Sequence, residues 1–371
     1  MAGLIAQDWV EPYGGAEKVL SALIDVLPPA ELACLWNDDP RWHSVLPVRE
    51  SWLSRSPLRG HKAIALPLMS PTWRFELRHL QPDWVVTSSY VFAHHLSAAF
   101  PDVPRFNYVH SPARYLWAPE HDQRGDSALV KSAAPPLRAL DRMAAGRTGS
   151  FAANSMFIRD RIRRAWDQDA VVIHPPVDSA QIAEVEDWAE QLTEQEHAVL
   201  ESLPRDEFLL AGSRMVPYKG HAKVIEMGET LGLPVVLTGS GPEEQRLRAQ
   251  AADARTKVFF LGRVTNEMLR ALYQRALAFV FPPVEDFGIM PVEAMAAGCA
   301  VIANRVGGAA ESVVDGETGA LIDPQDALSW TAAVEIAAQV RRDATKARAL
   351  EFDNEHFAAK VRAWVEPSIK V

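Results

Sequence analysis

Short apolar runs alternate with longer segments of helical periodicity along the chain. The runs are too short for helices and apolar at nearly every position, which is typical of strands covered on both faces. They occupy residues 3–6, 83–89, 105–110, 150–154 and 170–176, and then 208–213, 234–239, 257–262, 277–283 and 300–304. Between them, helical patterns lie at residues 16–27, 243–254, 266–276 and 291–298. This alternation predicts doubly wound α/β sheets.

The series of strands is interrupted between residues 175 and 208 by a charged helical segment. We interpret this interval as a linker plus the first helical element of a second domain. The pattern then predicts a Rossmann-like domain at residues 1–177, a second at residues 178–351, and a cleft between them. Residues 352–371 end the chain with an amphipathic helix.

Composition and charge narrow the possible functions. The net charge of −10 and the pI of about 5.6 argue against nucleic-acid binding, which needs a basic surface. The only two cysteines, Cys34 and Cys299, are far apart, so we expect no disulfide framework and a reducing compartment. The first residues, MAGLIAQDW, lack a signal-peptide pattern, and no apolar window is long enough to span a membrane. We therefore expect a cytoplasmic protein, with attachment to a membrane surface left open.

Two carboxylates bracket the start of one predicted helix, in the stretch EDFGIMPVE. Glu285 follows a predicted strand, and Glu293 falls in the first turn of the helix, where the dipole favours an anion. The carboxyl ends of parallel strands are where such sheets bind ligands, and carboxylates accept hydrogen bonds from hydroxyls. Gly288 would let a ligand approach the backbone closely. From the spacing alone, a helix-start carboxylate and a solvated loop charge are the simpler interpretation.

Two cations follow another predicted strand, in the stretch SRMVPYKG. Arg214 and Lys219 could hold a diphosphate there, one as a fork of donors and the other as a point charge. A solvated loop with incidental cations is an equally good interpretation.

Two further loops follow strands of the first half. Gly14 and Gly15 precede a helix and could admit a phosphate at its N-terminus, although a plain tight turn is commoner. His110 precedes a polar aromatic loop, YVHSPARYLW, where a structural and a site role are equally plausible.

Other patterns argue for no cofactor. The stretch TGSGPEEQRL lacks the third glycine of a dinucleotide fingerprint, so we expect no nicotinamide binding. The Asp-Gln-Asp sequence at residues 167–169 precedes a strand, at the wrong end of the sheet for a ligand site. No His/Cys cluster has the spacing of a zinc site.

Residues 41–80 are locally basic within this acidic chain, and four aromatic residues are interleaved with the cations. Cations with interfacial aromatics suit docking on an anionic membrane. A solvated face over an ordinary core is the simpler interpretation, so membrane attachment is a hypothesis.

Taken together, these motifs resemble the family-four retaining glycosyltransferases, which have the GT-B fold. The resemblance covers nearly the whole chain. Its most specific part is the E-x7-E spacing with Phe-Gly inside, followed by EAMAAG and GG-x-x-E in residues 285–311. Residues 110–123 look most like bacterial mannosyltransferases of surface-polysaccharide pathways.

The resemblance implies roles for individual residues. Arg214 and Lys219 would hold the donor diphosphate, Glu293 the nucleotide ribose, and Glu285 the sugar hydroxyls. His110 would meet the donor sugar near its reacting carbon. The implied catalytic set is His110, Arg214, Lys219 and Glu285. The implied donor-binding set adds Gly14, Gly15, Gly262, Arg263, Val264, Phe287, Gly288, Ile289, Met290 and Glu293, and the acceptor-binding set is Arg114, Tyr115 and Trp117.

The resemblance also implies an acceptor-binding first domain, a nucleotide-sugar-binding second domain, and a final helix that crosses back to the first. The donor would be a nucleotide-diphosphate hexose, with GDP-mannose favoured by the His110 loop, and the acceptor a glycan or lipid-linked glycan. No metal would be required. We expect retention by same-face attack, because no carboxylate is placed as a covalent nucleophile. A nucleotide-sugar epimerase, a sugar phosphorylase and a non-catalytic nucleotide-sugar-binding subunit remain alternatives.

Overall fold

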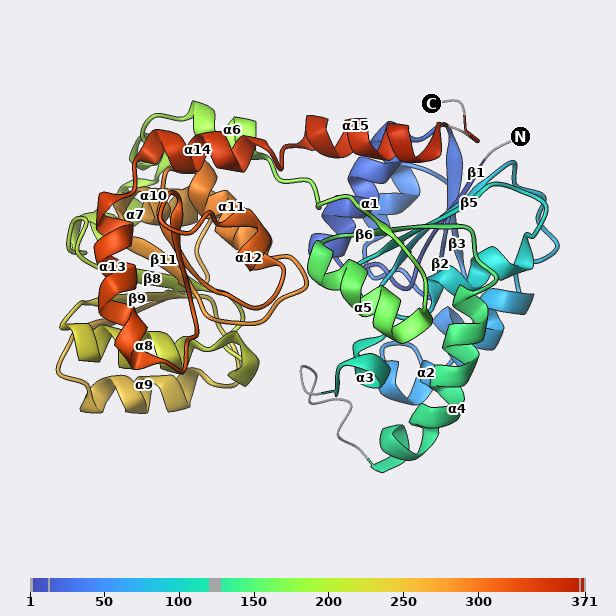
Figure 1. The fold of residues 1–371 in the computed structure, drawn as a ribbon, viewed down its shortest axis with the longest axis horizontal. Coiled ribbons are helices and arrows are strands. Elements are labelled where there is room, and N and C mark those ends of the chain that lie inside the picture. The colour runs from blue at the N-terminus through green and yellow to red at the C-terminus, as the bar shows by residue number, and fades with distance from the viewer. Residues whose placement is uncertain (1–2, 13, 120–127, 367, 370–371) are drawn as a thin grey trace. The chain divides into compact units, whose positions relative to one another are not determined.

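The computed structural model describes residues 3–12, 14–119, 128–366 and 368–369. Residues 120–123, part of the predicted acceptor loop, therefore lie outside the described residues. The chain divides into two compact units (Figure 1). The first comprises residues 1–176 and 355–371, and the second residues 177–354. The expected cleft between the two units stays a prediction.

The first unit is built on a seven-stranded parallel sheet with the order β3-β2-β1-β4-β5-β6-β7. Its strands are β1 (Gly3–Gln7), β2 (Ala30–Cys34), β3 (Val48–Glu50), β4 (Val85–Ser89), β5 (Arg105–Val109), β6 (Ser150–Ala153) and β7 (Val171–Val172). The order reverses between β1 and β4, which lie side by side in the middle of the sheet. Strands β2 and β3 were not predicted, because their polar residues break the apolar pattern.

Helices cover both faces of this sheet (Figure 1). They are α1 (Gly15–Val26), η1 (Pro40–Ser44), η2 (Trp52–Arg55), α2 (Lys62–Phe75), η3 (Ala93–Ala99), α3 (Arg114–Trp117), α4 (Ala128–Ala145), α5 (Met156–Trp166) and α15 (Asn354–Val365). One buried cluster joins α1 and α15 to the sheet, and another lies under α2, η3 and α3. Cys34 is free and buried in the first of these clusters.

The second unit has a six-stranded parallel sheet with the order β10-β9-β8-β11-β12-β13. Its strands are β8 (Leu209–Gly212), β9 (Val235–Thr238), β10 (Val258–Gly262), β11 (Ala278–Phe281), β12 (Val301–Asn304) and β13 (Gly319–Ile322). This order reverses between β8 and β11. Strand β13 was not predicted, because four residues that open with a glycine form too weak a pattern.

Helices also cover both faces of the second sheet (Figure 1). They are α6 (Ser179–Glu184), η6 (Trp188–Gln191), α7 (Glu194–Glu201), η7 (Pro217–Lys219), α8 (His221–Leu231), α9 (Glu244–Asp253), α10 (Asn266–Arg275), α11 (Ile289–Ala296), α12 (Ala309–Ser312), η8 (Ala327–Ser329), α13 (Trp330–Gln339) and α14 (Arg342–Leu350). Cys299 is free and buried here, as its apolar surroundings led us to expect.

The interval between residues 175 and 208 is more than a linker. Ile182, Trp188 and Leu200 are buried in the core of the second unit. The helix α7 begins at a capping box, in which Thr193 and Glu196 each bond the other's backbone N–H. The whole segment is thus folded into the second unit, and the prediction of a linker for part of it was wrong.

The last helix returns to the first unit, as the resemblance implied. Phe357 and Val361 of α15 are buried against the sheet, in the same cluster as Val19 and Leu20 of α1. The indole N–H of Trp364 donates to the Ser150 hydroxyl at 2.8 Å. The chain passes from the first unit to the second between residues 176 and 177 and returns between residues 354 and 355. Both points lie within a few residues of the expected domain boundaries. Among the described residues, no helix combines the length and apolarity needed to cross a membrane.

Candidate functional site

The second unit gathers its predicted site residues around one point of its sheet. Strands β8 and β11 are neighbours, and the connections that leave them run to opposite sides. The crevice outside the carboxyl ends of two such strands is the usual ligand site of an open α/β sheet. The loop after β8 carries Arg214 and Lys219, and the loop after β11 carries Glu285. Parallel folding therefore brings together charges that are about 70 residues apart in sequence.

One ion pair joins these two loops. The Lys219 Nζ donates to Glu285 Oε1 at 2.5 Å, and both side chains are mostly buried, with exposed fractions of 16% and 14%. A charge pair screened from water in this way interacts much more strongly than a surface pair. Lys219 also lies 5.4 Å from the ring centroid of Tyr218 and 5.9 Å from that of Phe281. The cation is thus fixed at the mouth of the crevice.

Arg214 differs from Lys219 in its surroundings. Its side chain is exposed, and no carboxylate of the described part of the chain forms an ion pair with it. The guanidinium fork is therefore available for a diphosphate or another bidentate anion.

One histidine at this edge was not predicted from the sequence. His221, the first residue of α8, is buried, and its Nε2 lies 3.3 Å from the Ser213 hydroxyl. Burial, and then the nearby Lys219, lowers the pKa of His221 to about 4. Its Nδ1 is buried without a hydrogen-bond partner among the described residues. No local pattern singled His221 out, because it resembles an ordinary helix-start residue.

Gly288 caps the N-terminus of α11 with a positive φ of 98°. An added Cβ would also lie 3.2 Å from Ala309, so the position needs glycine in both conformation and space. Phe287 is buried, and its ring lies 5.7 Å from that of Phe352, tilted by 50°. Glu293 follows in the second turn of α11, rather than in the first turn that the sequence predicted. The stretch predicted to surround the donor sugar and ribose is thus a glycine-initiated helix N-terminus.

Gly307 and Gly308 pack against the backbone of the Glu285 loop. The N–H of Gly308 donates to the Glu285 carbonyl at 2.8 Å. An added Cβ on Gly307 would lie 2.9 Å from that carbonyl, and one on Gly308 would lie 2.2 Å from the Asp286 carbonyl. The Gly-Gly of the GG-x-x-E motif therefore lets its backbone pack directly against the backbone of residues 285–286. This contact fixes the position of the Glu285 loop.

The remaining donor candidates line the same edge of the sheet. Gly262 ends β10 with a positive φ of 68°, and its carbonyl accepts from the Gly239 N–H at 2.6 Å. Arg263 donates to the Ser240 hydroxyl at 3.1 Å. The side chains of Val264, Ile289 and Met290 are partly buried against the core. These residues form apolar and backbone surfaces at this edge, whereas the charged groups come from the loops after β8 and β11.

The first unit has its own point of reversal, between β1 and β4. Gly14 and Gly15 lie in the loop that connects β1 to α1, with Gly15 as the first residue of that helix. His110 directly follows β5, and its Nε2 lies 2.9 Å from the Ser88 hydroxyl at the end of β4. The rings of Tyr90 and Tyr108 meet the imidazole edge-on, at 5.9 and 5.2 Å. His110 and the glycine pair are thus gathered at the carboxyl edge of this sheet.

The predicted acceptor residues occupy the short helix α3. Tyr115 is buried in the core, and Arg114 is half-buried. Trp117 turns its indole N–H inward and donates to Asp141 Oδ2 at 2.6 Å. Two of the three candidates therefore hold the loop in place, and their contact with an acceptor stays a prediction.

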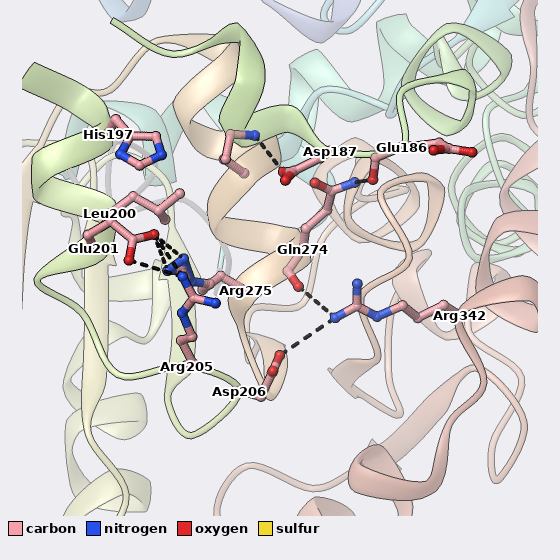
Figure 2. Close-up of a pocket in the computed structure, with 12 residues that line it drawn as sticks. Glu186, Asp187, His197, Leu200, Glu201, Arg205, Asp206, Gln274, Arg275 and Arg342 are labelled. Atoms are coloured by element: carbon pink, nitrogen blue, oxygen red, sulfur yellow. Dashed lines mark hydrogen bonds and ion pairs between the residues drawn. The ribbon is translucent and has the colours of Figure 1, made fainter. Parts of the chain in front are cut away.

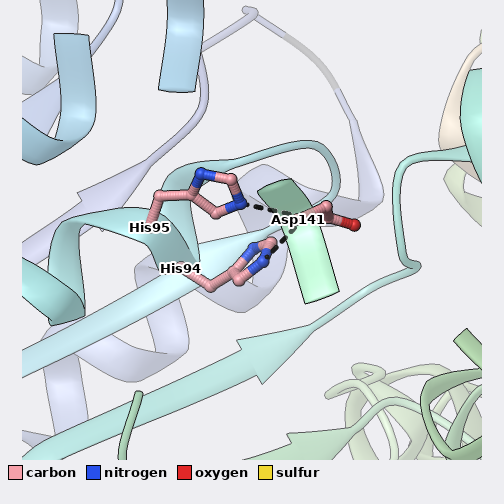
Figure 3. A group of neighbouring side chains, drawn as sticks. All are labelled: His94, His95 and Asp141. Carbon is pink, nitrogen blue, oxygen red and sulfur yellow. Dashed lines mark hydrogen bonds and ion pairs between the residues drawn. The ribbon is translucent and has the colours of Figure 1, made fainter. Parts of the chain in front are cut away.

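Asp141 on α4 is the hub of a fully buried polar cluster (Figure 3). Its Oδ1 accepts from His95 Nε2 at 2.9 Å and lies 3.1 Å from His94 Nε2. The second contact is electrostatic, because His94 Nε2 has no well-aligned hydrogen-bond partner among the described residues. Its Oδ2 accepts from the indole N–H groups of Trp117 and Trp166. Burial raises the pKa of Asp141, but both histidines oppose it, and the net effect is a pKa below the usual range.

His94, His95 and Asp141 also form a group that could hold a metal ion. The other ring nitrogens, however, are hydrogen-bonded to the hydroxyls of Ser89 and Ser70, at 3.0 and 2.7 Å. The Asp141 carboxylate is already occupied by its contacts with His94, His95, Trp117 and Trp166. We therefore interpret the cluster as a structural hub that ties together α2, η3, α3, α4 and α5.

The buried His95 predicts a pH dependence of stability. Burial and then the neighbouring His94 lower its pKa to about 4, against the opposing effect of Asp141. The unfolded chain binds this proton near the ordinary value of about 6.5. Between these values the unfolded state holds more protons, so the free energy of unfolding should fall as the pH drops from about 6.5 to about 4.

Urea unfolding of the wild type and of His95→Gln at pH 7 and pH 5 checks this prediction. The variant is less stable at both values, yet it should lose less stability on acidification, because residue 95 no longer titrates. His197→Gln, at an exposed position, should keep the wild-type pH dependence. Equal losses in the wild type and in His95→Gln would contradict the prediction.

A separate cavity of about 600 Å³ lies at the opposite edge of the second sheet (Figure 2). Arg205 and Asp206 precede β8, and Arg275 precedes β11, so this cavity is at the amino ends of the strands. Figure 2 shows Arg205 and Arg275 converging on Glu201, and Arg342 reaching Asp206. The three arginines are all paired with carboxylates of the same cavity, and none of the predicted donor residues lines it.

Known proteins show what this chain is similar to. The family "Glycosyl transferases group 1" matches residues 193–350. A GDP-mannose-dependent alpha-(1-6)-phosphatidylinositol monomannoside mannosyltransferase of Mycolicibacterium smegmatis is 25% identical, over 97% of this chain and 94% of its own length. A phosphatidyl-myo-inositol mannosyltransferase of the same species is 31% identical over 46% of this chain and 43% of its own.

Solved structures share the fold at low identity. Anabaena HepE, in complex with UDP and glucose, has a TM-score of 0.71 and 17% identity, covering 99% of this chain and 100% of that one. Sucrose-phosphate synthase of Thermosynechococcus elongatus has a TM-score of 0.72 and 18% identity, covering 98% of each chain. The two parallel sheets and these likenesses agree: the chain has the two-domain GT-B fold, and residues 193–350 of its second unit match the group 1 glycosyl transferases.

Proposed function

We propose that the protein transfers a hexose, mannose from GDP-mannose, to a glycan or lipid-linked acceptor with retention of anomeric configuration. The observation that carries this proposal is the charge arrangement at the β8/β11 reversal. There the exposed Arg214 and the mostly buried Lys219–Glu285 pair lie beside the N-terminus of α11. These groups match a ligand that combines a diphosphate with hydroxyls.

The chemistry follows from what such a donor needs. Cleavage of the C1–O bond passes through an oxocarbenium-like state, and negative charge develops on the leaving diphosphate. Cations already in place lower the barrier, because they need no reorganisation during the reaction. Arg214 and Lys219 supply them from this chain, and the proposed reaction needs no metal ion. The diphosphate then accepts the proton of the acceptor hydroxyl, which attacks from the same face.

Glu285 has two roles in this proposal. Before the donor binds, it holds Lys219 at 2.5 Å. With the donor bound, it would accept hydrogen bonds from sugar hydroxyls while Lys219 turns to the diphosphate. Glu293 would hold the ribose, and neither carboxylate acts as a nucleophile.

GDP-mannose is favoured as the donor by the names of the two mycobacterial relatives, one of which is GDP-mannose-dependent. The complex of HepE with UDP and glucose makes UDP-glucose the competing choice. Thermal-shift measurements with GDP, UDP, ADP and their sugars distinguish the two. We expect GDP and GDP-mannose to raise Tm most; a larger shift with UDP-glucose would overturn the choice of donor.

The same donors separate the alternative activities. An epimerase would isomerise its nucleotide sugar without an acceptor, a phosphorylase would depend on inorganic phosphate, and a non-catalytic subunit would bind without turnover. We expect nucleotide release that depends on an added acceptor and is independent of phosphate.

A lipid-linked acceptor would place the protein at a membrane. Within the basic region of residues 41–80, four exposed large apolar side chains lie on or beside the helix α2. Ile64, Leu68 and Phe75 of α2 are 60%, 38% and 56% exposed. Trp52, 47% exposed, lies beside them, because its indole N–H donates to Thr72 of the same helix. We refer to these four residues as the α2 face, and we propose that it docks on an anionic lipid surface.

Charge complementarity favours this partner. Several cations of the region are neutralised by ion pairs, namely Arg41, Arg49, Arg59 and Lys62. Within the described residues, Arg55, Arg74 and Arg78 form no ion pair. In sequence, Arg55 and Arg74 lie between residues of the α2 face and Arg78 follows it, and all three would meet lipid phosphates.

Co-sedimentation with vesicles tests this docking. The wild type should bind vesicles containing phosphatidylglycerol much more strongly than pure phosphatidylcholine, and less strongly as salt rises. Ile64→Asp combined with Phe75→Asp should abolish binding. The matched control, Val306→Asp with Leu328→Asp, changes two exposed apolar residues of the second unit and should bind normally. Equal binding by both double variants would refute the α2 face.

A further inference from the structure

A chain of hydrogen bonds connects His110 to the interior of the first unit. Its members are Gln7 at the end of β1 and Ser88 on β4, both fully buried and paired across the two strands where the sheet order reverses. The Ser88 hydroxyl lies 2.9 Å from Gln7 Oε1 and 2.9 Å from His110 Nε2. The direction of each bond in this chain can be worked out from one fixed point.

The fixed point is a backbone carbonyl. Gln7 Nε2 lies 3.2 Å from the Trp9 carbonyl, which can only accept a hydrogen bond. The same nitrogen lies 3.2 Å from Glu17 Oε1, which already accepts from the Glu11 N–H at 3.1 Å. The amide of Gln7 must therefore point its NH₂ group at Trp9 and Glu17. Its oxygen then faces Ser88 and can only accept.

The remaining directions follow in sequence. Because Gln7 Oε1 accepts, the single hydrogen of the Ser88 hydroxyl is donated to it. The Ser88 oxygen can then interact with His110 only as an acceptor. His110 must carry a hydrogen on Nε2, and in the neutral ring Nδ1 is the acceptor nitrogen.

We propose that Gln7 and Ser88 are positioning residues that hold His110 as the Nε2–H tautomer, with its hydrogen directed into the protein. The ring faces are fixed at the same time by the edge-on contacts of Tyr90 and Tyr108. His110 is also the residue expected to meet the donor sugar, and a single tautomer in a fixed ring plane would present the same polar atoms to that sugar in every molecule. This last step rests on the proposed function, whereas the tautomer itself does not.

Nitrogen-15 NMR of histidine-labelled protein without any donor tests the tautomer. The His110 signal is assigned by its loss in His110→Ala. We expect a directly bonded proton on Nε2 in the wild type, loss of that signal to solvent exchange in Ser88→Ala, and its return in Ser88→Thr. In Gln7→Met the Ser88 hydroxyl is released to donate, so the Nδ1–H form should appear.

Ser89→Ala is the matched control. Ser89 is the next residue of β4, is equally buried, and bonds a different histidine, His94, at 3.0 Å. Its removal should leave the His110 signal unchanged. A wild-type proton on Nδ1, or a signal unaffected by Ser88→Ala, would overturn the proposal.

Kinetics with GDP-mannose separate positioning from the proposed function. Ser88→Ala should lower kcat roughly tenfold, the order expected when one hydrogen bond to a reacting group is lost. In a His110→Ala background the same change should have almost no further effect. Additive losses would overturn the positioning role, whereas the absence of any transfer by the wild type would count against the proposed function and leave the NMR result standing.

Discussion

Alanine at Lys219 is expected to lower the rate of sugar transfer by about a hundredfold to a thousandfold, the range seen when one preorganised group that stabilises transition-state charge is removed. Lys219 is the less exposed of the two cations at the β8/β11 reversal, and its ammonium is fixed 2.5 Å from Glu285. The change removes the charge that faces the leaving diphosphate and leaves the Glu285 carboxylate without this partner. Initial rates of nucleotide release with GDP-mannose and an acceptor measure the effect.

Two further variants sharpen this prediction. Arg214→Ala should reduce turnover to a similar extent at little cost in stability, because its side chain is exposed. Lys223→Ala is the matched control, since Lys223 lies one turn along on α8 and pairs with Glu226 at 2.7 Å on the surface. It should keep wild-type turnover. Near-normal rates in both Lys219→Ala and Arg214→Ala would refute the proposed donor site.

Alanine at Asp141 should destabilise the first unit by about 3–5 kcal/mol, the usual cost of removing one partner of a buried charged network. The carboxylate is completely buried and accepts from His95, Trp117 and Trp166. Its loss leaves these donors buried without a partner and opens a cavity. Urea unfolding monitored by tryptophan fluorescence measures the change.

Milder variants keep this prediction testable if Asp141→Ala does not fold. Asp141→Asn keeps one acceptor oxygen and should cost less, and Trp166→Phe removes a single donor. Asp160→Ala, an exposed carboxylate on α5, should change the free energy of unfolding by less than about 0.5 kcal/mol. Equal effects of Asp141→Asn and Asp160→Ala would contradict the role of Asp141 as a hub.

The α/β alternation of the fold could be predicted because most of its strands are uninterrupted apolar runs buried on both faces. Strands β2 and β3 were not predicted because they lie toward the edge of their sheet. There Glu31 and Arg49 form an exposed ion pair, which breaks the apolar pattern. The segment 175–208 resembled a linker because its charges hide the few buried side chains, such as Trp188, that dock it.

For the donor half of the site, the sequence placed Arg214, Lys219 and Glu285 in loops that follow strands. It could not bring Lys219 and Glu285 together, since only the strand order makes β8 and β11 neighbours. His221 was missed because nothing in its local sequence shows that it is buried beside Lys219.

The Asp141 cluster could not be predicted from the sequence. Its members come from five helices, and no fixed spacing relates residues 70, 94, 117, 141 and 166. Trp117 is an example: its N–H is directed into the protein by a carboxylate that follows it by 24 residues, and the acceptor contact that the resemblance implied for it stays a prediction. Polar hubs of this kind depend on tertiary structure alone.

The proposal of retaining mannosyl transfer is tested most directly by the anomeric configuration of the product. The enzyme is incubated with GDP-mannose labelled with carbon-13 at C1 and with a phosphatidylinositol mannoside or octyl α-mannoside as acceptor, and the carbon–proton coupling at C1 of the product is measured by NMR. We predict an α-mannoside formed without added metal, and no product from Lys219→Ala. A β-linked product, or transfer only from UDP-glucose, would contradict the proposal.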